Sequence, residues 1–134
     1  MQKTKGFTII ELIVVIAIIA VLAAIVFVNV TGYINKSRNS AIKANLATIL
    51  VNATDYFYKN SNYTSFETSS GYTVPAAMLT NSPISSTPTY VGIATAFCVK
   101  ATLKDGTTVY CVDSTGYKGL LVSGKFVTGT YTCQ

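Results

Sequence analysis

The sequence predicts an α+β chain in which one long N-terminal helix packs, through its second half, on a small antiparallel β-sheet. Three patterns support this prediction. Residues 7–28 contain only two polar side chains, Thr8 and Glu11. Apolar residues then continue at helical spacing as far as Phe57. After residue 90, short runs rich in β-branched and aromatic residues are separated by turn residues. A chain of 134 residues has room for one such domain and an appendage.

The first segment, 7–32, is predicted to be an apolar helix long enough to cross a membrane. Its residues 12–28 are all apolar. A helix over 7–28 would be about 33 Å long, which matches the hydrocarbon core of a bilayer. Lys3 and Lys5 precede the segment, so the positive-inside rule places its N-terminal side in the cytoplasm.

Glu11 distinguishes this segment from an ordinary secretory signal peptide. A signal peptide is cut after its apolar core, at a small-residue site that Ala20, Ala23 or Ala24 could supply. A carboxylate that inserts into lipid costs about 2–3 kcal/mol or more, so it usually marks a functional partner. Glu11 and the helical pattern beyond residue 28 therefore favour a helix that is retained, with a signal peptide as the alternative.

The helix is predicted to continue as an amphipathic half over 33–59 and to end around Tyr58 to Asn60. Gly32 is its weakest point, at a cost of about 1 kcal/mol relative to alanine. No proline occurs before Pro75, so nothing in the first part of the chain forces a kink. The apolar positions that recur every three or four residues, with one gap, are Val30, Ile34, Ala41, Ile42, Leu46, Ile49, Ala53 and Phe57.

The rest of the chain divides into a loop and a sheet. Residues 60–89 are rich in Ser, Thr and Asn and hold all three prolines, which predicts a long loop with at most one short element around Pro75 to Leu79. Residues 90–134 are predicted to form the antiparallel sheet, whose apolar face the amphipathic helix covers. The expected strands are 90–102, 107–112, 118–122 and 125–132, with a hairpin turn at 104–106.

The composition argues against an enzyme. The sequence has no histidine, which removes every Ser-His and Cys-His nucleophile, and it has no CxxC pair. We therefore expect no catalytic residue, no cofactor and no metal site. The net charge is +5, but only Lys36, Arg38 and Lys43 lie close together. This group is typical of a solvated helix face, and contact with a membrane surface or with DNA is the weaker interpretation.

The residues Lys5-Gly6-Phe7-Thr8-Ile9-Ile10-Glu11-Leu12 resemble the processing and methylation motif of bacterial type IV pilins and their pseudopilin relatives. The order of long helix, loop and small sheet resembles the same family over the whole chain. The resemblance implies that a prepilin peptidase removes a class III leader, 1–6, by cutting between Gly6 and Phe7 on the cytoplasmic face. It also implies N-methylation of the new Phe7 amine. Gly6 has no side chain, so a protease can approach the backbone closely there.

The resemblance also implies where the protein acts and with which partners. The mature chain would wait in the inner membrane, with lipid around its apolar helix and its N-terminus in the cytoplasm, before entering a helical filament outside. Its partners would be the prepilin peptidase, other pilin subunits, and an inner-membrane platform with its assembly ATPase.

A structural pilus subunit is therefore the expected function. A pseudopilin of a type II secretion or DNA-uptake system is the alternative, and a membrane-anchored enzyme or binding module has the least support. Some secretion pseudopilins carry a calcium-binding acidic cluster, and only Asp105 and Asp113 would be available for one here. DNA binding through Lys36, Arg38 and Lys43 is the weakest of the partner predictions, because these residues lie on the helix close to the expected filament core.

Glu11 has a specific role in this interpretation. It lies four residues after Phe7, about 6 Å along a helix. A buried carboxylate needs a counter-charge, and cleavage creates one in the Phe7 amine. In the family pattern this Glu pairs with the Phe amine of a neighbouring subunit, so a misregistered subunit would keep an unpaired charge in apolar surroundings. One departure is that relatives often carry a proline late in the apolar segment, where this chain has Val28.

The three cysteines, Cys98, Cys111 and Cys133, fit the family habit of stapling the external domain. We expect a Cys98–Cys111 disulfide, worth about 3 kcal/mol, because the two residues lie on the same side of the predicted hairpin. They would face each other if residues 104–105 form the loop, or be diagonal neighbours if residues 105–106 do. A Cys111–Cys133 disulfide, which would tie down the C-terminus, is the alternative, and the connectivity does not follow from the sequence alone.

Overall fold

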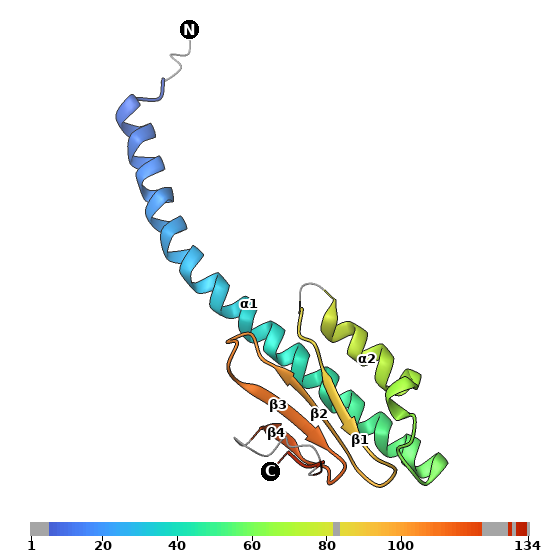
Figure 1. Cartoon of the computed structure of the whole chain (residues 1–134). Coiled ribbons are helices and arrows are strands. Elements are labelled where there is room, and N and C mark those ends of the chain that lie inside the picture. The colour runs from blue at the N-terminus through green and yellow to red at the C-terminus, as the bar shows by residue number, and fades with distance from the viewer. Residues whose placement is uncertain (1–5, 82–83, 122–128, 130, 134) are drawn as a thin grey trace. The chain divides into compact units, whose positions relative to one another are not determined.

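The computed structural model describes residues 6–81, 84–121, 129 and 131–133. The chain forms two compact units, and the division between Ile34 and Asn35 falls within its longest helix. The elements in order are α1 (Ile9–Asn60), the 3-10 helix η1 (Phe66–Thr68), α2 (Ser70–Thr80), β1 (Thr89–Gly92), β2 (Phe97–Thr102), β3 (Val109–Asp113) and β4 (Lys118–Leu120) (Figure 1). A long N-terminal helix followed by a small antiparallel sheet confirms the predicted fold class, and α1 ends where the sequence placed its end.

The second half of α1 covers one face of the sheet, as its apolar spacing predicts. Ile42, Leu46, Ile49 and Ala53 recur along one side of the helix and are fully buried. They belong to the same core as residues that point from the sheet and from the connecting segment. These are Tyr63, Phe66, Leu79, Phe97, Val99, Ala101, Leu103 and Val112. Burial of these side chains is the main stabilising contribution to this unit, because apolar surface is removed from water.

The sheet is antiparallel throughout, with strand order β1-β2-β3-β4. Between β2 and β3 the Leu103 N–H donates to the Thr108 carbonyl at 2.7 Å, which leaves a four-residue loop. Within it the Gly106 N–H donates to Leu103 O at 3.0 Å, and Gly106 has a positive φ of 78° that favours glycine. The hairpin turn predicted at 104–106 is therefore confirmed, and its register is the one centred on residues 105–106.

The single strand expected over 90–102 is wrong, because the chain reverses in its middle. β1 and β2 are separate antiparallel strands that pair Gly92 with Phe97. The Ile93 N–H donates to Ala96 O at 2.8 Å and closes the connection. The reversal stacks the rings of Tyr90 and Phe97 at 6.3 Å on the side facing α1, which a continuous strand could not do. The imperfect alternation of this run marks the turn.

Two further strand predictions have different outcomes. β4 covers Lys118–Leu120, so the strand expected over 118–122 is present in a shorter form. Most of the strand expected over 125–132 lies outside the described residues, and 131–133 are not in a strand.

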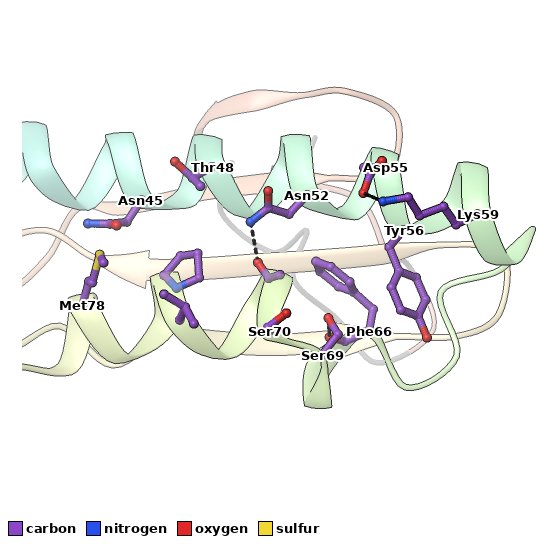
Figure 2. A pocket seen from close by; sticks show the side chains of 13 residues that line it. Asn45, Thr48, Asn52, Asp55, Tyr56, Lys59, Phe66, Ser69, Ser70 and Met78 are labelled. Carbon is purple, nitrogen blue, oxygen red and sulfur yellow. Dashed lines mark hydrogen bonds and ion pairs between the residues drawn. The ribbon is translucent and has the colours of Figure 1, made fainter.

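The short element expected around Pro75 to Leu79 is present, but it is part of the longer helix α2, which has 11 residues. The rest of α2 and the 3-10 helix η1 lie where a loop was predicted over 60–89, so that part of the prediction is wrong. Pro75 sits inside α2 and has no N–H to donate to the carbonyl of Gly71. Asn52 of α1 takes over that role, since its Nδ2 donates to Gly71 O at 2.8 Å (Figure 2). A helical proline is tolerated here because a neighbouring helix supplies the missing donor, and a reading of local sequence cannot find that donor.

This arrangement predicts that Asn52 and Pro75 are energetically coupled. Asn52→Ala should cost about 1 kcal/mol of unfolding free energy, because the Gly71 carbonyl loses its donor. The cost should be smaller in a Pro75→Ala background, where residue 75 regains an N–H for that carbonyl. Denaturant unfolding of the two single variants and the double variant in detergent measures the coupling. Asn45 is the matched control, because its Nδ2 donates to Ala41 O within α1. Additive effects of Asn52 and Pro75 would contradict the assignment.

Candidate functional site: the start of the apolar helix

Gly6, Phe7 and Thr8 lie just before α1 and are exposed. Thr8 and Glu11 bond each other across the first turn of the helix. The Thr8 N–H and hydroxyl donate to Glu11 Oε2 at 2.9 and 2.7 Å, and the Glu11 N–H donates to Thr8 Oγ1 at 3.2 Å. This reciprocal arrangement is a capping box, in which a Thr before the helix and a Glu three residues later satisfy backbone donors that have no partner in the helix.

Thr8 is a helix-capping residue that the sequence reasoning did not single out, although its signal is local. A Thr followed three residues later by a Glu, immediately ahead of an apolar run, is the pattern of a capping box. In the single chain Glu11 therefore already has partners in its own helix start. Any contact between Glu11 and another molecule must add to these bonds or replace them.

The side chains around Glu11 form an apolar surface. Phe7 and Ile9 are each 78% exposed and Ile10 is 74% exposed, and the exposed large side chains continue to Phe27. By length and composition alone, α1 is the one described helix that could cross a membrane. Its most apolar stretch lies near the N-terminus of the chain. A signal sequence at that position would have the same length and composition. An apolar surface of this extent needs lipid or protein to cover it.

The cysteines gather on the other face of the sheet, and they do not pair as expected. The structure joins Cys111 to Cys133, with Cα atoms 5.9 Å apart, and leaves Cys98 free and buried. The preferred Cys98–Cys111 pairing is therefore wrong in this structure, which contains the alternative. The register pairs Cys98 with Asp113, so Cys98 and Cys111 are diagonal neighbours, not directly opposite. Their Sγ atoms nevertheless lie 2.8 Å apart.

Asp113 holds the C-terminal segment, here residues 131–133, against the sheet. Its Oδ2 accepts the Cys133 N–H at 2.7 Å, and its Oδ1 accepts the Thr115 N–H at 2.9 Å. The Oδ1 contact forms an Asx turn, because this Asp accepts the N–H of the residue two positions later. The bond to Cys133 joins residues 20 positions apart, and no local pattern reports it.

The structure adds little support for DNA binding through the basic residues of α1 or for a catalytic site in the groove between α1 and α2. Lys43 is exposed, and its Nζ lies 5.5 Å from the centre of the Tyr110 ring, a cation–π contact that a solvated helix face can make. The groove between α1 and α2 measures about 660 Å³ and is lined mainly by small polar and apolar side chains (Figure 2). Asp55 is the one carboxylate among its described lining residues, and it pairs with Lys59 at 2.7 Å. This groove offers no carboxylate pair for acid–base chemistry.

Comparison with known proteins bears on the helix start. Residues 1–27 match the family model of the prokaryotic N-terminal methylation motif. Over 70 residues the chain is 34% identical to the type IV major pilin protein PilA of Myxococcus xanthus (strain DK1622). Both findings support the type IV pilin and pseudopilin family. The aligned part is 52% of this chain and 32% of that relative, so the chain spans about a third of the relative's length. An N-terminal apolar helix that carries this methylation motif is consistent with membrane anchoring.

Proposed function

We propose that the chain is a structural subunit of a type IV pilus or pilus-like filament, with no catalytic activity of its own. The observation that carries the proposal is the methylation motif at the start of an exposed apolar helix whose first turn holds a carboxylate. Such a surface is stable in a bilayer or against the same surface of other subunits. The major-pilin relative supports a filament-forming role.

In this proposal, prepilin peptidase cuts between Gly6 and Phe7, removes the leader 1–6 and exposes an amine that is then methylated. The position suits a protease, because Gly6 and Phe7 precede the helix and are exposed. Before assembly the protein is an inner-membrane protein with a cytoplasmic N-terminus, surrounded by lipid. The platform and assembly ATPase then transfer it to a filament outside the membrane.

Glu11 acts in the proposed filament as a device that sets subunit register. Its carboxylate pairs with the Phe7 amine of a neighbouring subunit. Before assembly, the capping box fixes the position of this carboxylate at the first turn of the helix. A correctly staggered subunit is neutralised, whereas a misplaced one leaves a charge in apolar surroundings at a cost of several kcal/mol. The apolar helices themselves supply most of the packing.

A pseudopilin of a secretion or DNA-uptake system is the alternative, since the methylation motif is common to both groups. A calcium-dependent pseudopilin has no support from the two acids considered for it. Asp105 accepts N–H bonds from Thr107 and Thr108 in the β2–β3 loop. Asp113 ends β3 and is fully buried. The length of β3 lies between them, so they do not form one ligand cluster.

Co-expression with a prepilin peptidase tests the processing step. We expect the mature protein to lose six residues and to carry one methyl group on the Phe7 amine, both measured by mass spectrometry. Gly6→Leu is the matched control, because a Cβ at Gly6 would meet no atom within 4 Å and the fold should not change. This variant should remain uncut, because its side chain blocks close approach of the protease. An intact Met1 or cleavage after Ala24 would overturn the proposal.

A further inference from the structure

The three cysteine sulfurs meet at one buried point, on the face of the sheet opposite the α1 core. Cys98 lies between Phe97 and Val99 on β2, so strand alternation turns it away from the helix. Its Sγ lies 2.8 Å from Cys111 Sγ and 3.1 Å from Cys133 Sγ. All three side chains are at most 1% exposed. The free Cys98 thiol therefore contacts both sulfurs of the one disulfide among the described residues. Because this disulfide is buried, thiols in the solvent cannot easily reach it.

We propose that Cys98 is an internal nucleophile whose substrate is the Cys111–Cys133 disulfide. Cys98 Sγ lies beside the disulfide, close to both of its sulfurs, so the thiolate first rotates into line with the Cys111–Cys133 bond. It then attacks Cys111 Sγ, a Cys98–Cys111 bond forms, and the Cys111–Cys133 bond breaks. The electron pair of the broken bond leaves on Cys133 Sγ, which takes up the proton that Cys98 gave up. The chain begins and ends with one disulfide and one thiol, so the exchange needs no oxidant or reductant.

Geometry selects the Cys98–Cys111 isomer over Cys98–Cys133. The first pair is the closer one, and the β2–β3 register already holds both residues on one face of adjacent strands. The exchange converts a link between β3 and the C-terminal segment into a link between β2 and β3. Cys133 is then held by the bond from its N–H to Asp113. The C-terminal segment thus exists in two covalent states. In one it is joined to β3 by the Cys111–Cys133 disulfide, and in the other it has no disulfide to the sheet.

The surroundings of Cys98 set the rate of exchange, because only the thiolate attacks. Burial, with a smaller contribution from the Asp113 carboxylate, raises the pKa of the Cys98 thiol to about 12, although Lys100 opposes the shift. Tyr117 and Leu121 pack against the sulfur cluster and add to its burial. Since the thiolate fraction grows about tenfold per pH unit below the pKa, the rate should rise about tenfold per unit between pH 7 and 10.

Thiol mapping of the full chain in detergent tests the exchange. Samples held at pH 7 to 10 are quenched in acid, unfolded, labelled at the free thiol with N-ethylmaleimide, and digested with trypsin. Cleavage after lysine places the three cysteines in separate peptides, 60–100, 105–118 and 126–134. We expect the label to move from the peptide with Cys98 to the peptide with Cys133. Protein that has been fully reduced and reoxidised should reach the same final ratio.

Two variants make the outcome decisive. Cys98→Ser removes the nucleophile, so it should keep the Cys111–Cys133 bond and take no label at any pH. In Cys133→Ser, Cys98 and Cys111 are the two cysteines that remain. We expect them to form a disulfide with each other in a folded chain. A label that stays on Cys98 for a day at pH 10 would overturn the proposal. So would an exchange rate that rises with protein concentration, because it would show that the reaction occurs between molecules.

Discussion

Replacing Glu11 with alanine is expected to abolish filament assembly while leaving cleavage after Gly6 intact. The substitution removes the proposed partner of the Phe7 amine, so every subunit would carry an unpaired positive charge into an apolar filament core, at a cost of several kcal/mol. Cleavage should persist because the residues on either side of the cut are unchanged. Negative-stain microscopy of sheared surface material measures assembly, and mass spectrometry of the membrane fraction measures processing.

The capping box requires controls that separate its role from that of charge. Glu11→Gln keeps an acceptor that suits a capping box but removes the negative charge. Thr8→Val has the opposite effect, since it removes the hydroxyl that bonds Glu11 and leaves the carboxylate. If charge pairing sets the register, Glu11→Gln should fail to assemble and Thr8→Val should assemble. Normal filaments from Glu11→Gln would refute the pairing, and loss of filaments only in Thr8→Val and Glu11→Ala would assign the effect to capping.

The parts of the fold that depend on one segment at a time could be predicted from the sequence. The extent of α1 and the face it buries follow from apolar spacing, and the hairpin turn within 104–106 follows from turn chemistry, although its register does not. A short element around Pro75 was predicted, but the full extent of α2 was not, because Pro75 argues against a longer helix unless Asn52 of α1 is known to lie beside Gly71. The division of 90–102 into β1 and β2 leaves only an imperfect alternation in the sequence, and the contact that accompanies it, between Tyr90 and Phe97, joins two strands.

The same distinction applies to the candidate sites. Gly6, Phe7 and Glu11 were predicted from a short contiguous motif, and the capping role of Thr8 could have been predicted from the same residues. The Cys98–Cys111 disulfide was preferred because both residues lie on one side of the predicted hairpin, and Cys111–Cys133 was kept as the alternative. The observed bond depends on the C-terminal segment, which the buried Asp113 carboxylate brings to β3 from 20 residues away. A disulfide between segments that are far apart in the sequence cannot be predicted from the residues of either segment alone.

Asp113→Ala is expected to cause the largest loss of stability among single polar substitutions in the second unit, about 3–5 kcal/mol. Asp113 is fully buried, and its two oxygens accept the N–H groups of Thr115 and Cys133 at 2.9 and 2.7 Å. Hydrogen bonds to a charged group contribute about 1.5–3 kcal/mol each, and their loss leaves buried donors without partners. Denaturant unfolding in detergent, followed by near-ultraviolet circular dichroism of the tyrosines, measures the loss with the Cys111–Cys133 disulfide intact.

Asp113→Asn separates the two functions of the carboxylate. Its amide oxygen can still accept the Thr115 N–H and keep the turn, but its NH₂ group would face the Cys133 N–H, donor against donor. We therefore expect an intermediate loss of stability, together with a larger share of the Cys98–Cys111 isomer, because the C-terminal segment is held less firmly. Asp55→Ala is the control for removing an acid, since Asp55 is exposed and paired with Lys59, and it should cost at most about 1 kcal/mol. Equal losses at Asp113 and Asp55 would show that the C-terminal segment does not depend on the buried carboxylate.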